Sequence, residues 1–210
     1  MNSITRYTHI RNRALLRMGE IVYRDIRGDL NNFLDNTFEA FAINYPKFYK
    51  MDAGSKAGFL ATEMLLRDIE LKTDYKPQEV ALILSSAHGS LDTDIRYFES
   101  TKTMASPALF VYTLPNIVAG EICIRNGIKG ENAFFVSKQF DANQMHDYVE
   151  VVMASEHTQA CIAGWVDVLG AQHEVFLYLV EKQERDSAVV HTANNLQTIY
   201  QLKQYGTVNC

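Results

Sequence analysis

The apolar residues of the chain fall into two kinds of pattern. The run Val80–Leu84, VALIL, is continuously apolar, which is typical of a central strand that helices cover on both faces. Other short runs of apolar and β-branched residues predict further strands, at Ile4–Ile10, Ile21–Ile26, Ala133–Ser137, Ala160–Val168 and Glu174–Glu181. The last two strands follow each other without an intervening helix, which favours a mixed sheet.

Apolar residues spaced three and four positions apart predict the helices. The first helix follows Asp29, whose side chain can cap it, and ends near Pro46. The second runs from about Ser55 to Leu71, and the polar residues expected on its outward face are Lys56, Glu63, Arg67 and Asp68. Further helices are predicted at Pro115–Asn126, at about Phe140–Ala154 and around Ala193–Leu202. The polar segment Ser85–Asp94 is predicted to be a loop.

Strands that alternate with helices predict an α/β fold. The chain has 210 residues, of which 47% are hydrophobic, so it can bury a sizeable core without metal or disulfide support. It contains no internal repeat, low-complexity tract or Pro/Ser-rich linker. One domain over residues 1–210 is therefore expected.

Charge and cysteine content exclude several classes of partner and cofactor. Twenty Lys and Arg stand against 25 Asp and Glu without a basic run, which argues against binding to nucleic acid or to an anionic membrane. A signal peptide and a membrane span are not recognisable, so a cytoplasmic location is expected. Cys123, Cys161 and Cys210 lie far apart, and the glycine-containing segments around Lys56 and Gly127 lack P-loop spacing. We expect no disulfide framework, no metal and no cofactor.

His88, in SSAHGSLDTD, is a weak candidate for a catalytic group. It follows the predicted central strand, at a place where α/β proteins often carry function. Asp92 and Asp94 in the same segment are its candidate partners in acid–base chemistry, although such a pair more often only caps a turn.

Four longer segments follow one another in a recognisable order. They are FYKMDAGSKAGFLATEMLL from Phe48, VALILSSAHGSLDTD from Val80, SPALFVYTLPNIVAGEICIRNGIKGENAFFVSKQF from Ser106 and CIAGWVDV from Cys161. In order and spacing they resemble the N-terminal half of β-ketoacyl-acyl-carrier-protein synthases, the condensing enzymes of the thiolase-like superfamily. The third segment is similar to the stretch of Pro, Asn and Gly before the family's nucleophile, and the fourth resembles the family's Ala-Gly-Gly strand.

The resemblance covers about residues 45–181 and implies a thiolase-like half fold, with a mixed five-stranded sheet and helices on both faces. Residues 1–44 would add an N-terminal strand or hairpin and a helix, and residues 182–210 a polar tail that contains the last predicted helix. The predicted helix Phe140–Ala154 has a polar face opposite its apolar stripe, so we expect it to meet water or a polar partner there.

The same resemblance implies that this chain lacks the family's catalytic groups. Alignment of Gly130, Asn132 and Val136 with the family's pattern places the catalytic cysteine at Gln139, and Gln cannot form a thioester. No Cys, Ser or Thr lies between Lys138 and Asp147. The catalytic histidines of ketosynthases come from a C-terminal half that we expect to be absent here.

The sequence is compatible with three functions. The first is a ketosynthase-like protein of a fatty-acid, polyketide or polyene pathway, without condensing activity of its own. Because chain-length-factor subunits carry Gln at the nucleophile position, it would act as the dimer partner of a full-length ketosynthase. The second is a small homodimeric module that binds acyl groups or acyl carrier protein. The third is an independent enzyme that uses His88.

Ketosynthase dimers pair one strand across their two-fold axis, and the resemblance places that strand at Ala133–Ser137. An unpaired strand edge would otherwise invite aggregation. The expected partner interface therefore comprises Asn116, Ala133, Phe134, Phe135, Val136 and Ser137.

Overall fold

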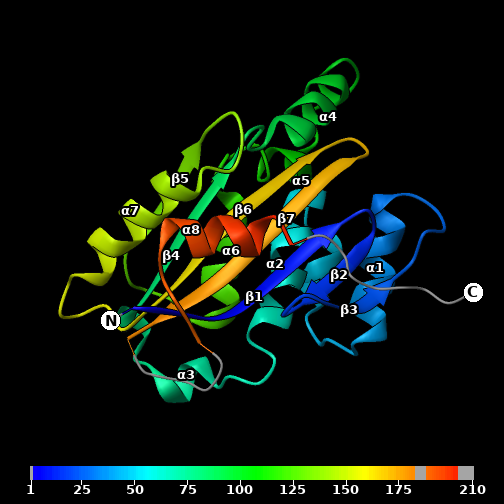
Figure 1. Ribbon diagram of the computed structural model, residues 1–210. Helices are drawn as coiled ribbons and strands as arrows, with labels where there is room; N and C mark the ends of the chain where they lie inside the picture. The colour runs from blue at the N-terminus through cyan, green and yellow to red at the C-terminus, as the bar shows by residue number, and fades with distance from the viewer. Residues whose placement is uncertain (1, 183–187, 203–210) are drawn as a thin grey trace, which may run out of the picture.

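A computed structural model describes residues 2–182 and 188–202, and a mixed eight-stranded sheet forms its centre (Figure 1). The strands run in the order β3-β2-β1-β7-β6-β4-β5, and β8 pairs with β1. Their bounds are β1 (Ser3–Arg11), β2 (Ala14–Arg17), β3 (Glu20–Arg24), β4 (Val80–Ser86), β5 (Asn132–Val136), β6 (Ala160–Leu169), β7 (Gln172–Glu181) and β8 (Val189–Val190).

Helices cover both faces of the sheet, as predicted. The bounds of the α-helices are α1 (Leu30–Ala40), α2 (Ala53–Leu65), α3 (Leu71–Asp74), α4 (Leu91–Thr101), α5 (Pro107–Phe110), α6 (Ile117–Asn126), α7 (Ala142–Met153) and α8 (Ala193–Tyr200). Two short 3₁₀ segments span Pro46–Lys50 and Pro77–Glu79. One apolar core joins α1, α2 and α6 to the sheet, and a second core joins α7 and α8 to the opposite face (Figure 1).

The parallel strands β5, β4 and β6 form one end of the sheet, and the remaining pairings are antiparallel. Every residue of β4 is buried, which confirms the interpretation of its apolar run as a central strand. Because the three strands are parallel, their carboxyl ends lie at the same edge of the sheet, which is where α/β proteins carry their sites.

The sheet is wider than the predicted five strands. The N-terminal segment folds into β1, β2 and β3, and β1 pairs with β7, so the predicted hairpin extends the main sheet. The helix predicted after Asp29 is confirmed as α1, and the Asp29 side chain accepts from the Asn32 backbone N–H.

Two local predictions are wrong. The segment Ser85–Asp94 is not all loop, because α4 begins at Leu91. Lys56 does not face solvent: it is buried, and its Nζ lies 2.7 Å from Asp35 Oδ1 on α1. An ion pair between adjacent helices thus replaces the expected solvated position.

The polar face of α7 is outward, as expected, with Asn143, Gln144 and Asp147 exposed. Within residues 2–182 and 188–202, no helix combines the length and apolar character that crossing a bilayer requires. Cys210 and residues 203–210 of the predicted polar tail lie outside the described residues.

Candidate functional site

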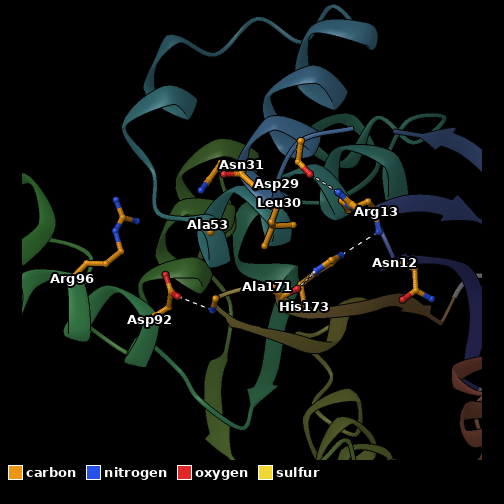
Figure 2. Close-up of a pocket in the computed structure, with 12 residues that line it drawn as sticks. Asn12, Arg13, Asp29, Leu30, Asn31, Ala53, Asp92, Arg96, Ala171 and His173 are labelled. Carbon is orange, nitrogen blue, oxygen red and sulfur yellow. Dashed lines mark hydrogen bonds between the residues drawn. The ribbon is translucent and has the colours of Figure 1, made fainter. Parts of the chain in front are cut away.

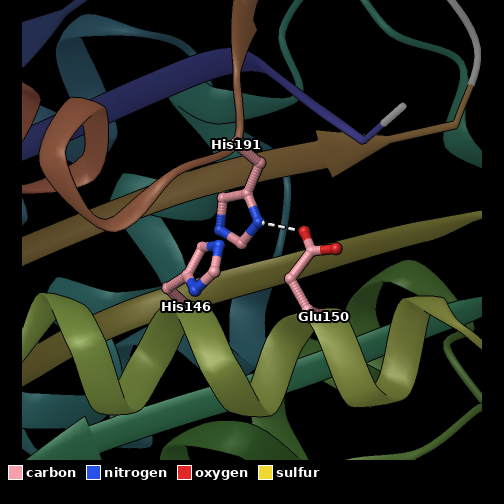
Figure 3. A group of neighbouring side chains, drawn as sticks. All are labelled: His146, Glu150 and His191. Carbon is pink, nitrogen blue, oxygen red and sulfur yellow. Dashed lines mark hydrogen bonds and ion pairs between the residues drawn. The ribbon is translucent and has the colours of Figure 1, made fainter.

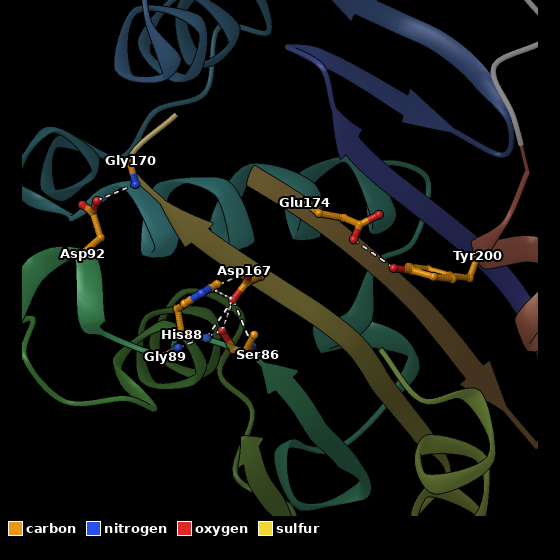
Figure 4. A network of polar contacts seen from close by, with 9 residues as sticks. Ser86, His88, Gly89, Asp92, Asp167, Gly170, Glu174 and Tyr200 are labelled. Atoms are coloured by element: carbon orange, nitrogen blue, oxygen red, sulfur yellow. Dashed lines mark hydrogen bonds and ion pairs between the residues drawn. The ribbon is translucent and has the colours of Figure 1, made fainter. Parts of the chain in front are cut away.

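His88 and Asp167 form a polar pair at the carboxyl ends of β4 and β6 (Figure 4). His88 Nδ1 lies 2.9 Å from Asp167 Oδ2. Asp167 Oδ1 accepts hydrogen bonds from Ser86 Oγ at 2.8 Å and from the backbone N–H groups of Ala87 and His88, both at 2.9 Å. The Gly89 N–H donates in turn to Ser86 Oγ at 2.9 Å. These contacts orient the imidazole and leave His88 partly exposed.

The Asp167 carboxylate is half-buried, which by itself would raise its pKa. The hydrogen bonds from His88 and Ser86 outweigh that effect and hold the pKa of Asp167 below its ordinary value. Asp167 is therefore ionised at neutral pH. An ionised carboxylate at Nδ1 favours a His tautomer whose other nitrogen can accept a proton, which is the arrangement of an acid–base pair.

The sequence identified His88 but not its partner. Asp92 Oδ1 accepts from the Gly170 N–H at 2.8 Å, and Asp94 Oδ2 accepts from Ser90 Oγ at 3.1 Å. Both belong to α4, so the expected pairing of His88 with one of them is wrong. Asp167 was not recognised as the partner because it lies far from His88 in the sequence. The one feature that could have indicated it is a carboxylate near the end of the predicted strand Ala160–Val168.

A second carboxylate stands opposite Asp167 on the neighbouring strand. Glu174 of β7 is the cross-strand partner of Asp167, an arrangement that is unfavourable for two like charges. Glu174 is compensated by Arg11, whose Nε lies 2.9 Å from Oε1, and by the Tyr200 hydroxyl, which donates to Oε2 at 2.9 Å. Burial, together with the Glu174 charge, raises the pKa of Tyr200. The two carboxylates thus keep separate partners (Figure 4).

Two polar hollows adjoin this row of charges. One, of about 380 Å³, has Asp167 and Glu174 in its lining. The other, of about 660 Å³, lies between the β1–β2 turn, the start of α1 and the start of α4 (Figure 2). They share Asn12 and His173, and the second also carries the charged residues Arg13, Asp29, Asp92 and Arg96. A polar ligand at this edge would therefore find both signs of charge.

Gln139 lies at the same edge of the sheet, in the loop between β5 and α7. It is exposed, and its backbone oxygen accepts a hydrogen bond from Ser137 Oγ at 3.1 Å. The Ser137 N–H donates to the Ser86 oxygen at 3.0 Å, which ties this loop to the end of β4. The helix itself begins later: Asp141 caps α7 by accepting from the N–H groups of Asn143 and Gln144. Gln139 thus precedes the helix N-terminus.

The expected interface strand, β5, lies at the end of the sheet. Among the described strands its only neighbour is β4. Phe134 packs into the core with α6, and Phe135 packs into the core with α7, where its ring centroid lies 4.7 Å from that of Tyr148. Both faces of β5 are therefore covered, while its outer backbone edge carries no described strand. Val136 at its end has 68% of its surface exposed.

The other predicted interface residue and the described cysteines lie elsewhere. Asn116 is exposed at the start of α6, directly after Pro115, which packs near Gly89. Cys123 is half-buried on α6, and burial raises the pKa of its thiol to about 11. Cys161 is buried in β6, and burial raises its thiol pKa as well. Both thiols are protonated at neutral pH, which makes them poor nucleophiles.

The geometry of this fold matches known structures, although no family model and no curated protein matches the sequence significantly. The ishigamide ketosynthase/chain length factor covers 89% of this chain at 15% identity, with a TM-score of 0.62. A chain in the structure of a type II polyketide synthase acyl-carrier protein in complex with its ketosynthase bound to the hexaketide covers 87% of this chain at 15% identity, with a TM-score of 0.60.

The chain has a thiolase-like half fold. It spans 63% and 62% of the length of those two matched chains. A ketosynthase in complex with its chain length factor from Xenorhabdus doucetiae matches over a longer share, 98% of this chain and 93% of that chain, at 12% identity and a TM-score of 0.57. The predicted fold class is therefore confirmed. In this thiolase-like half fold, Gln139, His88 and the open edge of β5 occupy neighbouring positions around the end of β4.

Proposed function

We propose that this chain is a ketosynthase-like subunit without condensing activity of its own, which pairs with a complete ketosynthase in fatty-acid, polyketide or polyene synthesis. The observation that carries the proposal is the match to a chain of nearly equal length in a ketosynthase–chain length factor complex, of which this chain covers 93%. Acyl carrier protein is a candidate further partner, because a matched structure contains one with its ketosynthase.

The chemistry of the site supports a role without thioester formation. Gln139, which the sequence resemblance places at the family's nucleophile position, offers an amide that can donate and accept hydrogen bonds but cannot form a thioester. Cys123 and Cys161 are protonated and lie in α6 and β6, away from the loop that holds Gln139. We infer that a partner supplies the cysteine and that this chain shapes the shared site.

The open edge of β5 supports pairing through the backbone. The Glu131 oxygen accepts from the Leu82 N–H, and the Ser137 N–H donates to the Ser86 oxygen, so the odd-numbered residues of β5 face β4. Backbone groups alternate along a strand, which directs those of Phe134 and Val136 to the open edge. A strand of the partner can bind there and continue the sheet. This pairing would cover the open edge and so protect it from aggregation.

Exposed apolar side chains near β5 favour the same surface. Pro115 and Ile117, just before and at the start of α6, line one small cavity together with Phe134. The segment before them carries large exposed apolar residues, namely Phe110, Val111 and Leu114. On α4, a further exposed apolar stripe comprises Leu91, Ile95 and Phe98. Tyr97 of α4 packs against Phe110, with ring centroids 5.5 Å apart, so these two groups adjoin. Adjoining exposed apolar groups are typical of protein–protein contacts.

The experiment is capture of the tagged full chain from its native cell, with mass-spectrometric identification of co-purifying proteins. Val136→Pro removes one backbone donor from the open edge without removing a bond to β4, and proline is tolerated on edge strands. Val136→Ala removes the exposed side chain but keeps the donor. We expect the native chain and Val136→Ala to retain a ketosynthase and Val136→Pro to lose most of it, with unchanged circular dichroism in both variants.

Absence of any ketosynthase from the native capture would contradict the proposal. Equal retention by Val136→Pro would contradict backbone pairing at β5. A homodimer that binds acyl carrier protein or acyl-CoA with no third protein would instead support the second function, the small carrier-binding module.

The His88–Asp167 pair is the specific observation that favours the third function, an independent enzyme. Asp167 orients His88 as an acid–base pair requires, beside a polar hollow of about 380 Å³. Under that alternative, the isolated chain would release carbon dioxide from malonyl thioesters, and His88→Ala would abolish the reaction. Activity that survives in His88→Ala, or that is absent from the native chain, would dismiss it.

A further inference from the structure

A separate cluster of side chains joins α7 to the segment between β8 and α8 (Figure 3). His146 and Glu150 lie four residues apart on α7 and therefore share one helix face. His191 follows β8 and reaches the same place from the far end of the chain. Each of the three offers one ligand atom, and these atoms all lie within 4.8 Å of one another.

The backbone holds His191 firmly in position. β8 pairs with the start of β1, and the His191 N–H donates to the Asn2 oxygen at 3.0 Å. The His191 side chain is fully buried, its ring centroid 5.8 Å from that of Tyr178 and 5.0 Å from that of His146. Two residues of the cluster thus come from a regular helix, and the third comes from a short connecting segment whose backbone is tied to Asn2.

The polar contacts leave nitrogen atoms available. His191 Nδ1 lies 2.6 Å from Glu150 Oε1, whereas the buried Nε2 atom has no hydrogen-bond partner among the described residues. His146 Nδ1 lies 3.0 Å from Asp147 Oδ1. Glu150 Oε2 accepts from the Asn2 amide at 2.9 Å. A buried nitrogen without a partner is unfavourable, and it points to a group that the cluster is built to receive.

We propose that His146, Glu150 and His191 bind one Zn²⁺ ion, each through one ligand atom. Two imidazoles and one carboxylate are a donor set that suits Zn²⁺ and leaves a fourth position for water. In tetrahedral geometry, ligand atoms about 2.1 Å from one ion lie about 3.4 Å apart, so side-chain adjustments of roughly an ångström bring the three together.

The surroundings fit such an ion. The contact of Asp147 with His146 and that of Asn2 with Glu150 are of the kind that orients metal ligands from outside. The His146 and Glu150 side chains are 25% and 36% exposed, so an ion can enter from solvent. The bound ion would fasten the segment after β8 to α7, independently of any ketosynthase partner.

The test is titration of the full chain, free of any affinity tag and treated with a chelator, with Zn²⁺ alone in a calorimeter. Glu150→Gln keeps the shape of the side chain but loses its charge, and His146→Ala removes a partly exposed ligand. His157→Ala is the matched control, since His157 is exposed and outside the cluster. X-ray absorption then identifies the atoms around the ion, and thermal melting reports its effect on the fold.

We expect one Zn²⁺ per chain, affinity at least tenfold weaker in His146→Ala and Glu150→Gln, and no change in His157→Ala. Absorption should show nitrogen and oxygen at about 2.0–2.1 Å, and saturating Zn²⁺ should raise the melting temperature by roughly 5 °C or more. The proposal is overturned if the native chain fails to bind one ion, if both cluster variants bind as tightly as the native chain, or if sulfur appears at about 2.3 Å.

Discussion

His9 is a buried histidine that stays neutral in the folded chain. It lies in β1, and its ring stacks on Phe176 with the centroids 4.7 Å apart. Burial, with a smaller contribution from the charge of Arg11, lowers the pKa of His9 to about 3. Its ordinary value is 6.5, so the folded chain resists a proton that the unfolded chain accepts.

This difference predicts that the free energy of unfolding falls as the pH drops from about 6.5 towards 3. Above that range His9 is neutral in both states and contributes no pH dependence. Within it the slope from His9 alone reaches about 1.4 kcal/mol per pH unit. Urea unfolding at pH 7 and pH 5 measures the change in the free energy of unfolding. In His9→Phe, which keeps an aromatic ring against Phe176, this pH dependence should be smaller by the contribution of His9. An unchanged slope in His9→Phe would show that other groups cause it.

At the scale of single residues, local chemistry was predictable from the sequence and distant partners were not. The capping role of Asp29 follows from neighbours a few positions away, and it is confirmed. His88 was recognisable because it follows a buried strand. Its partner Asp167 and the partner of Lys56, Asp35, depend on how separate elements pack, which no local pattern reveals.

At the scale of elements, β6 and β7 leave no room for a side chain at Gly164. Its φ of +150° lies outside the range that suits other residues, and a Cβ atom there would lie 2.0 Å from the Phe176 oxygen. Gly120, in α6, is a useful contrast because a Cβ there meets nothing within 4 Å.

We therefore expect Gly164→Ala to lower the free energy of unfolding by about 3 kcal/mol or more, because the strands must separate to admit the methyl group. Gly120→Ala should raise it by about 0.5–1 kcal/mol, since alanine favours the helix. Chemical denaturation of the two variants beside the native chain measures both. If Gly164→Ala were as stable as the native chain, β6 and β7 would have room for a methyl group at this position, which would contradict the prediction.

The strand and helix pattern was predictable wherever an element faces the core. The run of β4 and the stripe of α7 both bury their apolar residues, so the hydrophobic pattern reports them. Helix α4 was missed because its first turn contains Asp92 and Asp94, which suggest a loop. Its apolar residues Ile95 and Phe98 are exposed, so the helix has no apolar stripe that faces the core and that the hydrophobic pattern could reveal.

For the whole molecule, one sheet with an apolar core on each face accounts for the fold. The alternation of strands and helices made its class predictable, whereas its width was underestimated because pairing between β1 and β7 joins residues more than 160 positions apart. The open edge of β5 and the neighbouring exposed apolar groups are properties of the assembled chain. They are the features that a partner would use.

Native mass spectrometry of the chain purified from its own cells tests the central claim most directly. The account predicts one species whose mass is that of one 23.9 kDa chain plus one complete ketosynthase chain, and loss of that species in Val136→Pro but not in Val136→Ala. A preparation that contains only the single chain, or only a dimer of twice its mass, would contradict it.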